Sequence, residues 1–147
     1  MKRFVRCACL FLVIISVMTM PALAAEAADQ RASKFFGSSS AYFNVLSGSE
    51  FEIWFDVTAT GLMDELGASK IELERSSDGV NWSPVKTFYS SNYPQLLDPD
   101  DTSFTYSGYV THTYTSGYYY CATVTLYAKK GNGTGIMEVT TSILDLT

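Results

Sequence analysis

The chain has 147 residues, of which 47% are hydrophobic and 14% aromatic, and its net charge is -5 at neutral pH. That length allows one domain with its own core and is too short for two. The acidic balance disfavours nucleic acids and anionic lipid surfaces as partners, because both are bound mainly through lysine and arginine.

Residues 1–24 have the pattern of a secretory signal peptide. Basic residues stand near the start, an apolar run follows at Cys7–Met18, and Pro21–Ala24 supplies the small residues of a cleavage site. We expect cleavage after Ala24 and a secreted, extracellular protein that no longer contacts the membrane. An uncleaved anchor is the alternative, but the apolar run is only about half the length of a typical transmembrane helix.

Cysteine is too scarce in the mature chain for an internal disulfide. Cys7 and Cys9 leave with the signal peptide, so that Cys121 remains alone. A lone cysteine in a secreted protein reacts or pairs with another chain, or it is a half-buried thiol that behaves as a small hydrophobic residue. We favour the half-buried thiol, and we expect stability to rest on the hydrophobic core.

The segment 25–40 is predicted to be a flexible mature N-terminus, and a single domain is predicted to span residues 41–147. Phe35–Phe36 is a candidate for the start of the core, but Gly37–Ser40 has the composition of a flexible break. The first predicted strand is Tyr42–Leu46.

The clearest strand is Phe51–Thr60. Its apolar residues alternate with polar ones, which is the two-residue period of a strand with one buried side and one side in solvent. Trp54 falls on the solvent side. Two roles are open to it there: cover for a neighbouring side chain, which is the commoner case, and stacking on a ligand.

The segment Gly61–Ala68 is predicted to be one helical turn across the end of the domain. Leu62, Met63 and Leu66 have helical spacing, and Gly67 is suited to ending a helix. We expect the apolar side chains of this turn to close the core.

A β-hairpin follows, in which the strands Lys70–Arg75 and Val85–Tyr89 flank the turn Ser76–Asn81. Asp78–Gly79 in this turn favours the positive φ angles of a tight hairpin. Ser90–Ser103 has no period and contains two prolines. We expect it to be a long connection between two sheets.

Three more strands complete the pattern, namely Phe104–Thr115, a long central strand at Tyr118–Ala128, and Ile136–Ile143 after a glycine-rich hairpin. In the central strand the even-numbered residues form an unbroken apolar set. We predict that they face the core, which turns Cys121 outward. The inward side of the last strand is predicted to carry Met137, Val139, Thr141 and Ile143.

About seven short strands with closely spaced turns are typical of an all-β, antiparallel β-sandwich. Within that class, a resemblance is carried by Met63–Ala68, Ile71–Gly79, Trp82 with Val85–Phe88, and Gly117–Tyr120 running into Lys129–Asn132. Through these motifs, residues 50–135 resemble an uncharacterised family of small secreted proteins of Gram-positive bacteria with an immunoglobulin-like, more closely fibronectin type III-like, domain. The resemblance implies the sandwich fold and brings no established activity.

The motif Tyr119–Cys121 also resembles the tyrosine corner of antibody domains, where a tyrosine precedes the second cysteine by two residues. The matching first cysteine is missing from the early strand. Because the predicted parity turns Cys121 outward, Tyr118 or Tyr120 is the better candidate for a corner tyrosine. This arrangement is closer to the fibronectin-like version of the fold.

Groups for catalysis or metal binding are sparse. A dyad of His112 and Cys121 is conceivable, but no residue is evidently placed to orient the imidazole. Asp98–Asp101 offers oxygen ligands for weak calcium binding without the spacing of an EF-hand. Glu72 and Glu74 form a carboxylate pair on an outer strand face with no evident pocket. We expect no catalytic site, no metal site and no cofactor.

The remaining functional feature is an aromatic surface. Trp54, Tyr119 and Tyr127 are predicted to face outward, with Tyr109 as a further member. Outward aromatic residues on a β-sandwich anchor protein partners or stack on sugar rings, although they more often cover cross-strand neighbours. We predict a non-enzymatic secreted protein that makes protein contacts at or outside the cell surface. The alternative is a carbohydrate-binding module for cell-wall or host glycans.

Overall fold

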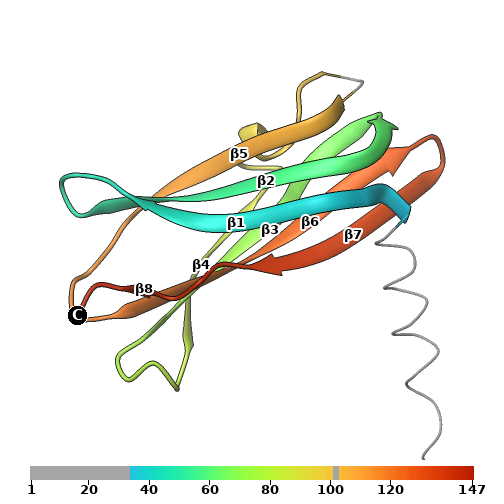
Figure 1. Ribbon diagram of the computed structural model, residues 1–147. Helices are drawn as coiled ribbons and strands as arrows, with labels where there is room; N and C mark the ends of the chain where they lie inside the picture. The colour runs from blue at the N-terminus through green and yellow to red at the C-terminus, as the bar shows by residue number, and fades with distance from the viewer. Residues whose placement is uncertain (1–33, 101–102) are drawn as a thin grey trace, which may run out of the picture.

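The computed structural model describes residues 34–100 and 103–147, which form two antiparallel β-sheets packed against each other (Figure 1). The all-β sandwich predicted from the sequence is confirmed. The predicted signal peptide, residues 1–24, lies outside the described residues. Within them, no helix is long and apolar enough to cross a membrane.

The first sheet, here called sheet A, has the strand order β1 (Phe36–Val45), β2 (Glu50–Met63), β5 (Ser103–Thr113). The second, sheet B, has the order β4 (Ser83–Tyr89), β3 (Glu65–Ser76), β6 (Tyr119–Lys130), β7 (Gly133–Thr140), and β8 (Leu144–Asp145) also pairs with β6. A short 3-10 helix, η1 (Pro94–Leu96), interrupts the connection from β4 to β5. The strands β1 to β7 agree with the predicted number of about seven.

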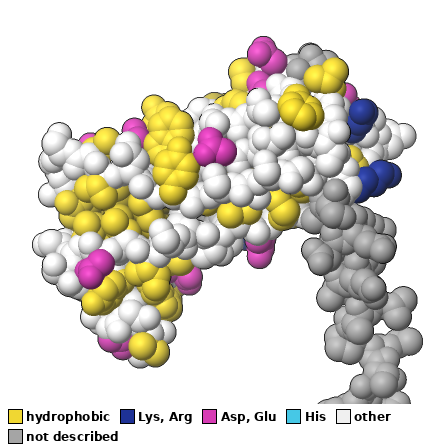
Figure 2. All heavy atoms as spheres, viewed as in Figure 1, with side chains coloured by type: hydrophobic (Ala, Val, Ile, Leu, Met, Phe, Trp, Pro, Cys, Tyr) yellow, Lys and Arg dark blue, Asp and Glu magenta, His cyan; other side chains and the backbone are white. Residues whose placement is uncertain are grey.

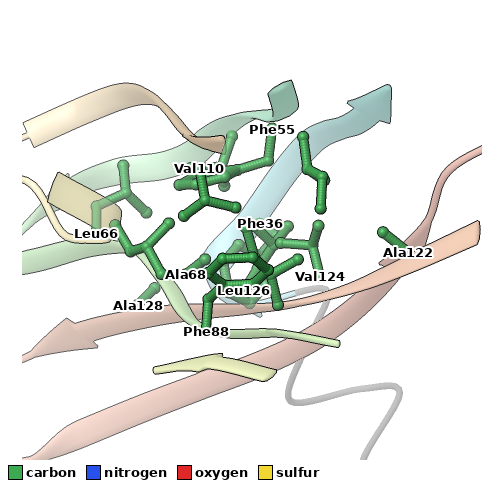
Figure 3. Packing of buried hydrophobic residues seen from close by; sticks show 14 of the residues in the cluster. Phe36, Phe55, Leu66, Ala68, Phe88, Val110, Ala122, Val124, Leu126 and Ala128 are labelled. Atoms are coloured by element: carbon green, nitrogen blue, oxygen red, sulfur yellow. The ribbon is translucent and has the colours of Figure 1, made fainter. Parts of the chain in front are cut away.

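The core fills the space between the sheets, where side chains from both meet in one layer (Figure 3). The inward side of β2 is at most 2% exposed and carries Phe51, Ile53, Phe55, Val57 and Ala59. The inward side of β6 is at most 1% exposed and carries Tyr120, Ala122, Val124, Leu126 and Ala128, which confirms the predicted parity. Burial of each large apolar side chain stabilises the fold by roughly 1.5–3 kcal/mol. A few such residues therefore contribute more than a disulfide, which contributes about 2–4 kcal/mol where it occurs.

Of the two candidates, Tyr118 and Tyr120, it is Tyr120 whose hydroxyl binds the backbone of the connection from β5 to β6. Its ring is 1% exposed, and its hydroxyl donates to the backbone carbonyl of Thr115 at 3.1 Å and accepts the backbone N–H of Thr115 at 3.0 Å. The next residue, Cys121, lies on the outer side of β6 and is half-buried, with Sγ 3.9 Å from the carbonyl oxygen of Thr141. The tyrosine, not the cysteine, thus fastens the connection from β5 to β6.

β1 begins at Phe36, so the predicted boundary between a flexible segment 25–40 and the domain lies too far along the chain. Gly37–Ser40, predicted as a break, belongs to β1 and lies beside β2. Phe35 and Phe36 are at most 9% exposed and join the core. Pairing with the long strand β2 overrides the weak strand propensity of glycine and serine.

The segment Gly61–Ala68 is not a helical turn. β2 continues to Met63 and β3 begins two residues later, so that the chain passes from sheet A to sheet B at Asp64. Met63 and Leu66 are at most 2% exposed and close the core as expected, whereas Leu62 points away with 59% exposure. Because the chain changes sheets between them, Met63 and Leu66 both face the core although they are three positions apart. This spacing is the same as that of two residues on one side of a helix.

β7 ends three residues before the predicted last strand does. Met137 and Val139 pack against the core and Thr141 is buried, as predicted, but Ile143 is 55% exposed. The backbone N–H of Thr141 donates to the carbonyl of Ala122 at 2.9 Å, and Oγ1 of Thr141 accepts the N–H of Ala122 at 3.1 Å. A side-chain oxygen here replaces a backbone acceptor, and the regular strand stops.

The β3–β4 hairpin forms as predicted, and Gly79 in its turn has φ +73°. The carboxylate of Asp78 accepts the backbone N–H groups of Val80 at 2.9 Å and Asn81 at 2.8 Å, and the hydroxyl of Ser76 donates to it at 2.8 Å. These bonds, above all those from Asn81, hold the pKa of Asp78 well below its ordinary value. The turn is fixed by its own side chains and is wider than a tight hairpin.

Candidate functional site

The outer face of sheet A carries a row of three aromatic side chains. Tyr42 of β1, Trp54 of β2 and Tyr109 of β5 are direct cross-strand partners. The ring centroids of Tyr42 and Trp54 are 6.4 Å apart with 6° between their planes, and those of Trp54 and Tyr109 are 4.5 Å apart with 22° between their planes. We call this row the aromatic ladder. Figure 2 shows a narrow hydrophobic band on the surface with an acidic side chain beside it.

The rings of the ladder stand upright on the sheet. The 4.5 Å between the centroids of Trp54 and Tyr109 is close to the spacing of neighbouring strands, which is about 4.8 Å. If the two nearly parallel rings lay flat on the sheet at that distance, their edges would overlap. The rings must therefore stack face to face. The faces of the Trp54 indole are therefore turned toward the tyrosines. Tyr42 and Tyr109, at the ends of the ladder, are 42% and 40% exposed.

A polar row borders the ladder on one side. Oε2 of Glu52 accepts the indole N–H of Trp54 at 2.7 Å and the side-chain N–H of Asn44 at 2.8 Å. The hydrogen bond from Trp54, with that from Asn44, lowers the pKa of Glu52 below its ordinary value. This carboxylate is ionised at neutral pH and is fixed in position by the ladder itself.

A second polar row borders the ladder on its other side. Oδ2 of Asp56 accepts the hydroxyl of Ser40 at 3.2 Å, and Oδ1 accepts the hydroxyl of Ser107 at 2.5 Å. These three residues lie opposite one another on β1, β2 and β5. The outer face of sheet A thus has an aromatic centre between two carboxylates that neighbouring strands hold in place.

The predicted aromatic surface is only partly correct. Trp54 and Tyr109 lie together in the ladder, but Tyr119 and Tyr127 are on β6 of sheet B. The ring of Tyr119 lies near Gly79 of the β3–β4 turn, and Tyr127 pairs with residues of β3 and β7. The combination of Trp54, Tyr119 and Tyr127 as one surface is therefore wrong.

Tyr42 is the ladder residue that the sequence prediction missed. It lies in the predicted first strand, and its side relative to Trp54 depends on the register of β1 against β2. A shift of one residue would move every side chain of β1 to the other face. The useful signal in the sequence is the alternation across Ala41 and Phe43, both of which pack against the core and leave Tyr42 outside.

The conceivable His112–Cys121 dyad does not form. His112 is on β5 of sheet A and Cys121 is on β6 of sheet B. The thiol has a raised pKa because it is partly buried, which disfavours a reactive thiolate.

The carboxylate pair on sheet B lies in an open hollow of about 300 Å³ lined by Glu72, Leu73, Glu74, Pro84, Thr87, Thr123 and Glu138. Nζ of Lys70 is 2.7 Å from the carboxylate of Glu72 and forms an ion pair with it. In the acidic segment Asp98–Asp101, Asp98 accepts hydrogen bonds from the hydroxyl of Ser103 and the backbone N–H of Asp100. In the part of the chain that the structure describes, no group of three or more His, Cys, Asp or Glu residues is arranged to hold a metal ion.

Mild acid is expected to destabilise the fold through His112. Its imidazole packs against Phe51 and Phe88, with centroids 5.7 and 6.4 Å away, and burial, with a smaller effect of the Lys86 charge, lowers the pKa of His112 below 6.5. The unfolded chain then binds a proton at a higher pH than the folded chain, so the free energy of unfolding falls as the pH drops below about 6.5. Urea denaturation at about pH 7.5 and about pH 5.5 measures this fall.

His112→Gln is the control for this pH dependence, because glutamine has no proton to gain in that range. We expect the variant to lose less stability between the two pH values than the parent chain. The carboxylates with lowered pKa values, Glu52, Asp78 and Asp145, gain protons only in stronger acid. An unchanged pH dependence in His112→Gln would assign the effect to another group.

No family model matches the chain, and no curated protein matches it. A crystal structure of a family 76 glycoside hydrolase from a bovine Bacteroides thetaiotaomicron strain is similar over 73% of this chain, with 14% identical residues and a TM-score of 0.29. This chain covers 20% of that structure. A similarity at this level carries no argument about function.

Proposed function

We propose that this protein is a secreted, non-enzymatic β-sandwich domain that binds a protein partner at or outside the cell surface through the outer face of sheet A. The observation that carries the proposal is the aromatic ladder of Tyr42, Trp54 and Tyr109 between two hydrogen-bonded polar rows. Protein interfaces combine an aromatic-rich centre with a polar rim, and tryptophan and tyrosine often supply most of the binding energy.

The orientation of the rings favours a protein over a sugar. Stacking on a sugar ring needs an open aromatic face, and the faces of the Trp54 indole are turned toward Tyr42 and Tyr109, which leaves a sugar only the outer faces of these two tyrosines. Ring edges and tyrosine hydroxyls instead suit the mixture of apolar and hydrogen-bonding groups on a protein surface. The alternative function is that of a carbohydrate-binding module, and the experiment below distinguishes it from binding of a protein.

The finer fold class and the location belong to the same proposal. Support for an immunoglobulin-like, fibronectin type III-like domain comes from the strand orders β1-β2-β5 and β4-β3-β6-β7, to which β8 is added, and from the hydroxyl of Tyr120 bound to the backbone of Thr115. Support for secretion comes from the signal-peptide pattern of residues 1–24.

Photo-crosslinking in the cells that produce the protein tests this function. A benzophenone amino acid in place of Tyr42, in the ladder, should give a discrete adduct with one protein. The same amino acid in place of Tyr89 on β4, which is 51% exposed, should not give that adduct. Equal adducts from both positions, or none from position 42, would contradict the proposal. Saturable glycan binding that is lost in Trp54→Ala would identify a carbohydrate module instead.

A further inference from the structure

We infer that the ladder binds an extended protein segment that presents lysine or arginine side chains on either side of an apolar or aromatic residue. This inference rests on the proposed function and adds the chemistry of the partner to it. It follows from the charge of sheet A, from the way Glu52 and Asp56 are held, and from their distance along β2.

The charge of sheet A is of one sign. Its three strands contain Glu50, Glu52 and Asp56 and no lysine or arginine. The basic residues of the described chain lie on sheet B, namely Lys70, Arg75, Lys86, Lys129 and Lys130, except for Lys34, which stands before β1 with its carbonyl bound to the hydroxyl of Thr60. A positively charged partner is attracted to such a face, whereas an acidic partner or the same face of a second copy is repelled.

The carboxylates of Glu52 and Asp56 are preorganised to bind a cation. Glu52 uses Oε2 for the hydrogen bonds from Trp54 and Asn44, and its Oε1 accepts none from the described residues. Asp56 is held from both sides by serine hydroxyls. Groups that are already fixed lose little freedom when a partner binds, which improves affinity.

The spacing of the carboxylates specifies the form of the segment. Glu52 and Asp56 lie two residues before and after Trp54, on the same side of β2. Their positions are therefore about 13 Å apart along the strand. In an extended peptide, residues four positions apart on one side have the same separation. Two cationic residues with one apolar or aromatic residue midway between them would contact both carboxylates and the ladder together.

An NMR titration of the secreted, ¹⁵N-labelled chain tests this inference with a synthetic peptide, Thr-Arg-Thr-Tyr-Thr-Arg-Thr. We expect shifts of the Trp54 indole N–H and of backbone amides in β1, β2 and β5. Peptides with glutamine or glutamate in place of both arginines should bind at least about fivefold more weakly. Binding of the arginine peptide should also weaken when the salt concentration rises from about 0.05 M to about 0.3 M, because exposed charges are then screened.

Two double variants with equal loss of charge separate the ladder from general attraction. Glu52→Gln with Asp56→Asn should weaken binding of the arginine peptide about fivefold. Glu74→Gln with Glu138→Gln, on sheet B, removes the same charge and should leave the affinity unchanged. Near-native thermal unfolding of both variants establishes that folding is intact.

Three results would overturn the inference. Equal binding of all three peptides at the ladder would show a binding surface without a preference for cations. Chemical-shift changes confined to sheet B would place the site for cationic peptides on that sheet. No shift changes with any peptide would show that the chain has no such site. The proposed function fails separately, when photo-crosslinking from the ladder gives no partner.

Discussion

Gly67→Ala is expected to destabilise the domain strongly. Gly67 lies on β3 with φ +152°, and an added Cβ would be 2.2 Å from the carbonyl oxygen of Leu96 and 2.9 Å from Cα of Leu97. Both contacts are with backbone, so no side chain can move aside. We expect a loss on the order of 4 kcal/mol, which is a large part of the free energy of unfolding of a typical domain, about 5–15 kcal/mol. Urea denaturation followed by circular dichroism measures it.

The reason for this sensitivity is the close approach of the β4–β5 connection to β3. Gly67 forms an isolated bridge with Leu97, and the N–H of Asp98 donates to the carbonyl of Leu66 at 2.8 Å. Leu96, in η1, is fully buried and anchors the connection in the core. The connection thus behaves as part of the packing of the domain, and its position depends on a residue without a side chain.

Gly117→Ala is the matched control. Gly117 has φ +84°, and nothing lies within 4 Å of an added Cβ. The substitution therefore costs only the strain of the backbone, about 1 kcal/mol. If Gly67→Ala were no more destabilising than Gly117→Ala, the connection could not lie against β3 as described.

Much of the fold could be predicted because burial leaves a clear pattern in single strands. The alternation along Phe51–Thr60 and the even-numbered apolar residues of β6 identified the inward sides correctly. The prediction failed at Gly61–Ala68, where two residues three positions apart face the core from different sheets. A local period does not reveal that the chain has changed sheets, because that depends on contacts distant in sequence.

The candidate site was only half predictable for the same reason. Parity placed Trp54 outside, but its partners depend on the register of β1 and β5 against β2. In contrast, Tyr119 and Tyr127 could have been excluded as neighbours from the sequence, because eight residues of one strand span about 27 Å. Outward parity alone therefore does not define a surface; the sheet and the position along the strand are also needed.

Trp54→Ala is expected to remove most of the affinity for the partner. The indole is the centre of the ladder, and it also donates the hydrogen bond that positions Glu52. Truncation of a central aromatic residue in an interface commonly costs about 2 kcal/mol or more, which corresponds to about thirtyfold in Kd. Trp54 is half-buried, so its truncation can also affect folding. Tyr109→Ala is therefore a second variant, which removes a more exposed ring of the same ladder.

The most direct test of the central claim is a calorimetric titration of the partner captured by photo-crosslinking against four chains: the parent, Trp54→Ala, Tyr109→Ala and Tyr89→Ala. All four must first unfold cooperatively, so that differences report binding and not folding. We expect both ladder variants to bind at least about tenfold more weakly than the parent and Tyr89→Ala to bind equally well. Undiminished binding by both ladder variants would contradict the account and place the partner on another face of the sandwich.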